Sequence, residues 1–179
     1  MNLKETKKSR QIIHESGFVN IYQDTVELPN GKDSERLIVI HPGASCVLAI
    51  RDDEKVVLVR QYRYALEDEF LEIPAGKLDP NEDPLTCARR ELEEETGYTS
   101  DEIVHLQTIH NAVGYSDEKI EIYLAEKLIK LESQRLDEDE FLTLEYYSVD
   151  EVMSMIEKNE LTDAKTIIAM QAYFLRKKA

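Results

Sequence analysis

Three glutamates on one face of a predicted helix constrain this sequence more than any other feature. Glu91, Glu94 and Glu95 follow the i, i+3 and i+4 spacing that brings side chains together within a helix over residues 84–96. Like charges at that spacing destabilise an isolated helix by about 0.2–0.5 kcal/mol per pair, so a counter-charge is needed. Arg90, one turn before Glu94, can pair with it and leave Glu91 and Glu95 for a cation. A hard divalent ion such as Mg²⁺ suits them, because it accepts carboxylate oxygens and keeps water and phosphate oxygens in its other positions.

A solvated acidic helix face is the alternative, because the whole chain is acidic. Its 179 residues include 22 Lys and Arg against 37 Asp and Glu, a formal net charge of −15. The glutamates alone leave both interpretations open. The charge balance excludes nucleic-acid binding as the main function, since neutralising phosphates requires a basic patch. With 42% apolar residues the chain can still bury a core of its own.

The sequence favours a cytoplasmic protein without membrane association. Cys46 and Cys87 form neither a CxxC pair nor a zinc-finger spacing, which favours a reducing compartment over a disulfide scaffold. Residues 1–8 carry charges where a secretion signal has its apolar stretch. The longest apolar runs are too short to span a bilayer.

The order of predicted elements indicates a mixed α/β fold. Asp83 suits the N-cap of the helix over 84–96, Pro84 its first position, and Gly97 the left-handed residue that ends it. Strands are expected over 18–27, 36–40, 44–50, 56–62, 103–109, 120–125 and 141–147. Two more helices are expected, one from Ser148 to about residue 156 and one from about Asp163. The last helix should bury a stripe made of Ala164, Ile167, Ile168, Phe174 and Leu175.

The first predicted helix belongs to a longer pattern that runs from Gly76 to Tyr98. It begins with G-K-L-D-P-N-E at residues 76–82. After a gap of seven residues, 83–89, it continues with R-E-L-E-E-E-T-G-Y at residues 90–98. This matches the Nudix box, G-x5-E-x7-R-E-U-x-E-E-x-G-U with U apolar, at every fixed position when Tyr98 is accepted as the last U. The chain therefore resembles the Nudix hydrolases. The resemblance implies a Nudix α/β/α sandwich with a mixed sheet, and hydrolysis of a nucleoside diphosphate linked to another group.

The resemblance also implies roles for the residues of the box. Glu91 and Glu95 are the implied Mg²⁺ ligands, with Mn²⁺ as a possible substitute. Glu94 is a further ligand or a catalytic support beside them, and the main-chain carbonyl of Ala75 is another metal contact. The box further implies structural roles, including a Glu82–Arg90 hydrogen bond, for Gly76, Glu82, Arg90 and Gly97.

Segments flanking the box resemble the ADP-ribose pyrophosphatase branch of this family. They are His41–Ala44, Arg60–Arg63, Leu71–Gly76 and Gly114–Glu118. The branch implies hydrolysis of ADP-ribose to AMP and ribose 5-phosphate. Where the branch commonly has Ser-Pro-Gly-Phe, this chain has Ala-Val-Gly-Tyr at 112–115, in a loop that lies near the terminal ribose in relatives. A pyrophosphatase for another nucleoside-diphosphate sugar is therefore the alternative.

A general base is expected in the acidic segment 137–140, directly before a predicted strand. In the branch the base is often the Glu of a Glu-Phe pair, which points to Glu140 and then to Glu138. The alternative for each of them, and for Asp139, is a solvated loop carboxylate. Four residues are candidate substrate contacts: Arg63, Arg36, Glu72 and Glu118. For Arg63 a salt bridge within the sheet is the alternative. Glu72 could instead be a metal ligand, or simply a strand carboxylate that faces the cleft.

Two domains are expected. Residues 1–40 form an N-terminal β region, and residues 41–179 form the Nudix hydrolase domain. The resemblance implies that the N-terminal region exchanges with a second copy, so that both protomers of a homodimer build each active site. A catalytically silent nucleotide sensor is the alternative from another functional class, although every box glutamate is present.

Overall fold

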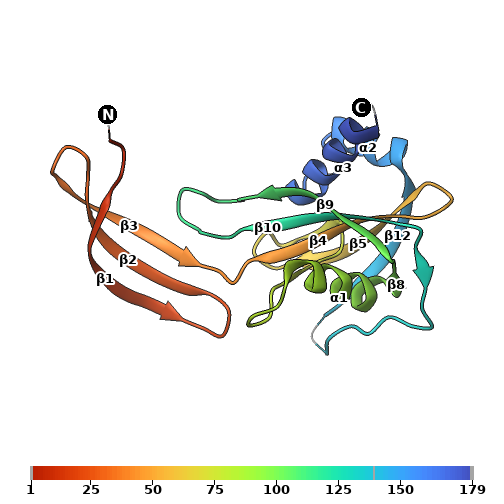
Figure 1. Ribbon diagram of the computed structural model, residues 1–179, viewed down its shortest axis with the longest axis horizontal. Helices are drawn as coiled ribbons and strands as arrows, with labels where there is room; N and C mark the ends of the chain where they lie inside the picture. The colour runs from red at the N-terminus through yellow and green to blue at the C-terminus, as the bar shows by residue number, and fades with distance from the viewer. Residues whose placement is uncertain (1, 139, 178–179) are drawn as a thin grey trace. The chain divides into compact units, whose positions relative to one another are not determined.

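The computed structural model describes residues 2–138 and 140–177, and these divide into two compact units (Figure 1). The N-terminal unit comprises the chain up to Gly43 together with His110–Lys119. The core unit comprises Ala44–Ile109 and the chain from Ile120 onward. No helix among the described residues is long and apolar enough to cross a membrane.

The N-terminal unit is an antiparallel sheet of three strands in the order β1-β2-β3. These are β1 (Thr6–Glu15), β2 (Asn20–Glu27) and β3 (Asp33–Ile40). Sequence reasoning missed β1, because its residues are largely polar and are exposed along the whole strand, so no core-facing alternation marks it. In the register, Asp24 lies between Arg10 and Arg36, and its carboxylate receives two hydrogen bonds of 2.7 Å from the Arg10 guanidinium.

The core unit is built on a mixed sheet. Its strand order is β12-β5-β4-β10-β9, with β6 paired to β5 and β7 paired to β4. The β4–β10 pair is parallel and the others are antiparallel, which explains why the sequence lacks regular β-α-β alternation. A separate two-stranded ribbon joins β8 to β11. The strand bounds are β4 Ala44–Ile50, β5 Lys55–Arg63, β6 Asp68–Glu72, β7 Ala75–Lys77, β8 Tyr98–Thr99, β9 Glu102–Ile109, β10 Ile120–Glu126, β11 Ile129–Lys130 and β12 Leu142–Ser148.

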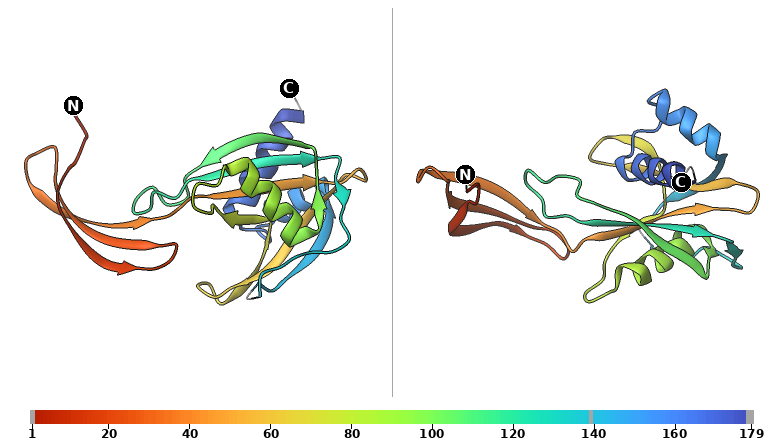
Figure 2. Two further views of the ribbon diagram at one scale, coloured as in Figure 1. Left: turned by 60° about the horizontal axis from the view of Figure 1, so that its bottom comes forward. Right: turned by 45° about the horizontal axis from the view of Figure 1, so that its top comes forward.

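Helices cover both faces of this sheet, so the predicted α/β/α sandwich is confirmed (Figure 2). Helix α1 (Pro84–Thr96) packs Ala88 and Leu92 onto one face. Helices α2 (Val149–Glu157) and α3 (Ala164–Lys177) pack onto the other. Because both faces are covered, all seven residues of β4 are buried, as in strands that read as continuous apolar runs.

The buried face of α3 differs from the expected stripe. Ile167 and Ile168 pack against the core, but Ala164 is exposed, Phe174 lies at its edge and Leu175 points outward. The fully buried positions are instead Thr166, Ala169, Met170 and Tyr173. Polar contacts at the start of the helix account for the difference, because the Thr166 hydroxyl accepts a hydrogen bond of 2.8 Å from the Ile73 N–H and so fixes the helix rotation.

Helix α1 begins and ends where the sequence predicts. The Asp83 carboxylate accepts hydrogen bonds from the N–H groups of Leu85 and Thr86, at 3.0 and 3.3 Å. Gly97 has φ +64° and donates to the Glu93 carbonyl at 2.9 Å. A side chain here would be strained, because L residues rarely adopt this φ and the ideal Cβ lies 3.3 Å from the backbone of Ser133 and Gln134.

Candidate active site

Two of the three glutamates on the α1 face are buried against the strand that precedes α1. Glu91 is 8% exposed and Glu95 is 2% exposed, whereas Glu94 is partly exposed. The Ala75 N–H donates to Glu95 Oε2 at 3.1 Å. Gly76 leaves room for the second carboxylate, because a Cβ at this position would overlap the Glu91 side chain. The packing therefore places both carboxylates beside the main chain of Ala75 and Gly76.

The ionised form of these buried carboxylates is disfavoured, although Arg90 partly balances Glu91. Burial raises the pKa of Glu91, and neighbouring Glu94 and Glu140 raise it further against the opposing charge of Arg90. Burial raises the pKa of Glu95 far above its ordinary value, and the charges of Glu91 and Glu140 add to the effect. A cation bound between Glu91 and Glu95 would relieve this electrostatic cost.

Arg90 holds the loop before α1 to the helix. Its Nε and Nη2 each donate to the Glu82 carboxylate at 2.9 Å, and Nη2 also donates to the Lys77 carbonyl at 3.2 Å. The Glu82–Arg90 pair implied by the box is thus present, and it lowers the pKa of Glu82 to about 2. The Asp79 N–H also donates to Glu82, at 3.0 Å. This network fixes the path of the loop.

Arg90 also contacts two of the candidate metal ligands. Its Nη1 donates to Glu94 at 3.1 Å, as expected, and to Glu91 at 2.7 Å. The expectation that Arg90 leaves Glu91 free was wrong. The reason is geometric: Glu91 is buried, and this guanidinium lies within its reach.

The donor set fits a hard divalent cation. Glu91 and Glu95 carry carboxylate oxygens, the ligand type such an ion prefers, beside the Ala75–Gly76 main chain, and Glu94 lies one turn away from Glu91. Within residues 2–138 and 140–177, no three Asp, Glu, His or Cys side chains are already arranged around one metal position. The Arg90 guanidinium contacts one carboxylate oxygen each of Glu91 and Glu94.

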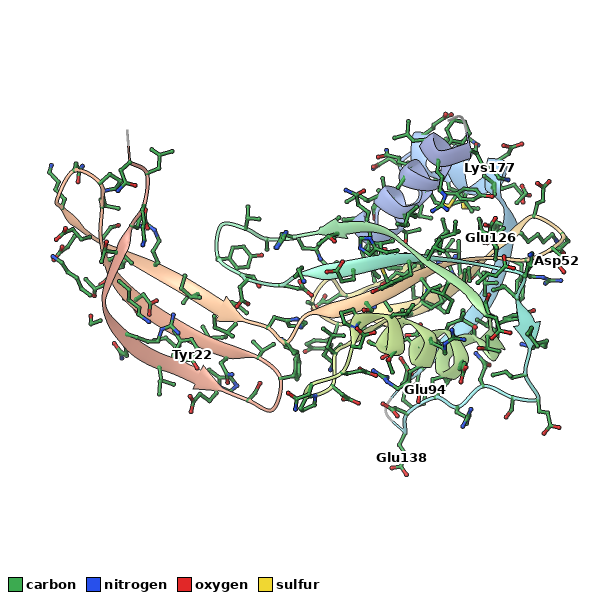
Figure 3. All side chains as sticks on the ribbon, viewed as in Figure 1. Tyr22, Asp52, Glu94, Glu126, Glu138 and Lys177 are labelled. Carbon is green, nitrogen blue, oxygen red and sulfur yellow. The ribbon has the colours of Figure 1, made fainter. Side chains whose placement is uncertain are left out.

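The structure distinguishes the candidate bases. Glu140 is partly buried, and its charge acts on both Glu91 and Glu95. Glu138 is exposed and points away from the core unit (Figure 3). Asp139 lies outside the described residues. Of the two described candidates, Glu140 is therefore the one that faces the buried carboxylates.

The segment that leads to Glu140 is anchored on the C-terminal end of α1. The Arg135 N–H donates to the Glu94 carbonyl at 3.0 Å, and the Gln134 side chain donates to the Glu95 carbonyl. These bonds satisfy carbonyls that the helix end leaves without intrahelical partners. Glu94 and Glu95 thus hold the segment that leads to Glu140 through their main-chain carbonyls, and their side chains belong to the candidate site.

Arg63 and Glu72 form the salt bridge that was the alternative for Arg63. Arg63 Nε and Nη2 donate to the two Glu72 oxygens, each at 2.7 Å, between β5 and β6. Burial alone would raise the pKa of Glu72, but Arg63 and Lys165 overcome it and hold the pKa below the ordinary value. Sequence reasoning missed Lys165, because it lies far along the chain, in the segment Asp163–Thr166.

Arg36 and Glu118 belong to the N-terminal unit. Arg36 donates to the Glu5 carboxylate at 2.6 and 3.0 Å. Glu118 lies 3.7 Å from His41 Nδ1. Both contacts are made within that unit, so substrate binding by these two residues stays a prediction.

Comparison with known proteins identifies the class to which this fold and site belong. A model of the NUDIX domain matches residues 39–170, and the chain is a member of the Nudix family, as its sequence predicted. It is 43% identical over 171 residues to the ADP-ribose pyrophosphatase of Bacillus subtilis (strain 168), which covers 95% of this chain and 92% of that protein. It is 46% identical over 170 residues to the methanol dehydrogenase activator of Bacillus methanolicus, which covers 94% and 91%.

A solved structure supports the fold independently. The crystal structure of an ADP compounds hydrolase superimposes with a TM-score of 0.85, covering 99% of this chain and 97% of that one. The sequence identity is 22%, so this likeness concerns the fold alone.

The Glu82–Arg90 pair leads to a prediction about stability. Because the folded pKa of Glu82 is about 2, below its ordinary 4.5, the pair stabilises the protein above pH 4.5 and loses this contribution as the pH falls toward 2. We expect Glu82→Gln to lower the free energy of unfolding by about 2 kcal/mol at pH 7, and by progressively less below pH 4.5. Urea unfolding at several pH values measures this. The exposed Glu157→Gln is the matched control, and equal stability of Glu82→Gln and the wild type at pH 7 would contradict the prediction.

Proposed function

We propose that this chain hydrolyses the pyrophosphate bond of ADP-ribose, with Mg²⁺, to give AMP and ribose 5-phosphate. The observation that carries the proposal is the pair of buried carboxylates, Glu91 and Glu95, beside the Ala75–Gly76 main chain with Glu140 facing them. The identity with the Bacillus subtilis protein, which is named an ADP-ribose pyrophosphatase, supports this choice of substrate.

The chain's own residues have separate tasks in this reaction. Glu91 and Glu95, with the Ala75 carbonyl and Glu94, would hold the metal, which supplies positive charge against the diphosphate. Glu140 accepts a proton from a water molecule as the water oxygen bonds to one phosphorus. The bridging oxygen then leaves with the other phosphate. Arg63 has Nη1 left for the diphosphate, since its bonds to Glu72 use Nε and Nη2.

A substrate screen tests this proposal directly. Release of phosphate-bearing products is measured with ADP-ribose, other ADP-sugars and GDP-sugars, each with Mg²⁺ and with Mn²⁺. Highest kcat/KM for ADP-ribose supports the proposal. Preference for another sugar nucleotide would establish the alternative substrate, and binding without hydrolysis of any of them would establish the sensor.

The similarity to the methanol dehydrogenase activator adds a second candidate, activation of a dehydrogenase. Adding this chain to a methanol dehydrogenase and measuring its rate tests that role. The inactive variant described next shows whether any activation requires hydrolysis. Location in the cytoplasm stays a prediction from the sequence.

We expect Glu95→Gln to lower kcat by at least about 100-fold, because it removes a charge that would hold the metal. Without metal, its Tm should equal or exceed that of the wild type, because the substitution relieves the burial of a charge next to Glu91. Activity at saturating Mg²⁺ and melting in EDTA are the two measurements. Near-wild-type turnover, or a clearly lower Tm in EDTA, would contradict the assignment.

Glu140 and Glu138 offer a matched pair on one loop. If Glu140 takes the proton, Glu140→Gln should lower kcat by about 10²–10⁴-fold with little change in KM or Mg²⁺ affinity. Glu138→Gln makes the same charge change on a side chain that points away, so it should retain wild-type activity. The opposite result would move the base to Glu138, and two fully active variants would place it elsewhere.

We also propose a homodimer in which the N-terminal unit of each protomer completes the partner's site. Val26 is the buried apolar side chain of this unit among the described residues, so the three-stranded sheet has little core of its own. Four of its large apolar side chains are about half exposed: Ile12, Ile13, Phe18 and Leu37. A second copy would cover such a surface.

Mixing two inactive variants tests this arrangement. If Arg36 acts in the partner's site, Arg36→Ala and Glu140→Gln protomers that exchange freely should recover about a quarter of wild-type activity, because half of the dimers are mixed and each has one intact site. Each variant alone is the control, and sedimentation gives the mass. A monomeric chain, or no gain on mixing, would refute the proposal.

A further inference from the structure

A buried cluster of four charged side chains joins the start of α3 to the sheet. Glu72 is 3% exposed and lies between two cations, Arg63 on β5 and Lys165 on α3. Lys165 donates to Glu72 Oε2, the same oxygen that Arg63 Nη2 contacts, and also to Asp163 Oδ1 at 3.0 Å. The side chain of Lys165 is 12% exposed, so an unpaired charge at this position would be costly.

The same cluster reaches the main chain of the candidate site. Asp163 accepts hydrogen bonds from the Thr166 N–H, at 3.0 Å, and from its hydroxyl. The Thr166 hydroxyl in turn accepts from the Ile73 N–H. Ile73 follows Glu72 and comes two residues before Ala75, whose N–H is bonded to Glu95.

The charges of this cluster cancel, and this matters for Arg63. Two carboxylates and two cations are present, so the Glu72 charge is shared between Arg63 and Lys165. With Lys165 removed, Arg63 would be the remaining cation that contacts Glu72. The negative charge of Glu72 would then offset the positive charge of Arg63, which would attract a diphosphate less strongly. Arg63 is the member of the cluster that is most exposed, at 42% of its side chain, and its bonds to Glu72 leave Nη1 available.

We propose that Lys165 is a positioning residue for substrate binding, which acts through Glu72 to keep the Arg63 guanidinium oriented and its charge available to the diphosphate. This inference rests on the proposed function. Lys165 itself donates to Glu72 and Asp163, and it shares Glu72 Oε2 with Arg63, so its effect on substrate passes through the shared carboxylate.

The test compares Lys165→Met with two variants that separate charge from structure. Lys165→Met should raise KM about 10-fold and change kcat less than about threefold, since the base and the metal ligands are untouched. Lys165→Arg keeps the charge and should restore most of the affinity. Thr166→Val removes the other link between α3 and the strand, so it should lower Tm without a comparable rise in KM. A wild-type KM in Lys165→Met, or an equal rise in Thr166→Val, would overturn the proposal.

A double-mutant cycle shows whether the effect passes through Arg63. In an Arg63→Gln background, Lys165→Met should raise KM less than about twofold further. Full additivity would overturn the proposal. Should Lys165→Met fail to fold, Lys165→Gln, which can still donate a hydrogen bond, takes its place with the same expectation.

Direct binding separates this inference from the proposed function. The Kd of α,β-methylene ADP-ribose, measured by calorimetry with Mg²⁺, should rise about 10-fold in Lys165→Met. If the wild type binds and hydrolyses ADP-ribose but Lys165→Met has an unchanged Kd, only the inference fails. If the wild type neither binds the analogue nor hydrolyses any sugar nucleotide, the proposed function fails and the inference fails with it.

Discussion

Two carboxylates buried next to one another, those of Glu91 and Glu95, are the constraint on which the rest of the core unit depends. Their mutual repulsion and their loss of hydration oppose folding in the absence of a cation, as their raised pKa values show. Such an arrangement persists only where the surrounding structure overdetermines it. Helix α1 is accordingly capped at both ends, and the Glu82–Arg90 pair ties it to the preceding loop. The helix caps and the Glu82–Arg90 pair stabilise the fold, and this offsets the unfavourable free energy of burying the two carboxylates.

The short segment from Glu72 to Gly76 links the two faces of the sheet. At its start, Glu72 and Ile73 bond to Lys165 and Thr166 of α3. At its end, Ala75 and Gly76 lie against Glu95 and Glu91 of α1. Few residues separate the two sets of contacts. A substitution in α3 can therefore shift the Ala75–Gly76 main chain, and with it the carboxylates of α1, through this short segment alone. The layered sandwich thus supplies rigid supports on both sides of the strand that carries the site.

The sequence predicted the features that depend on residues close together along the chain, and it missed those that depend on contacts between distant residues. The bounds of α1 follow from Asp83, Pro84 and Gly97, which act within a few residues of themselves, and the family followed from the box around it. The Glu72–Lys165 contact joins residues 93 positions apart, and no periodicity signals such a pair. The rotation of α3 escaped prediction for a related reason, because the polar Thr166 is buried by a hydrogen bond from Ile73, far away in the sequence, rather than by its own hydropathy. Strand β1 has no buried face, so the alternation that marks a strand was missing.

The partners of the basic side chains near the candidate site bear on how so acidic a chain could bind a dianionic diphosphate. Arg90 is committed to Glu82, Glu91 and Glu94, and Lys165 to Glu72 and Asp163, so neither has much charge left for a ligand. Among residues 2–138 and 140–177, Arg63 makes its hydrogen bonds through Nε and Nη2 only. One partly free guanidinium cannot neutralise a diphosphate in a protein with a net charge of −15. A bound cation would supply further positive charge, and its binding at the carboxylates of Glu91 and Glu95 would relieve the electrostatic cost of burying them together. Metal binding and substrate binding are therefore two parts of one charge balance, in which the ion offsets the buried carboxylates and the diphosphate together.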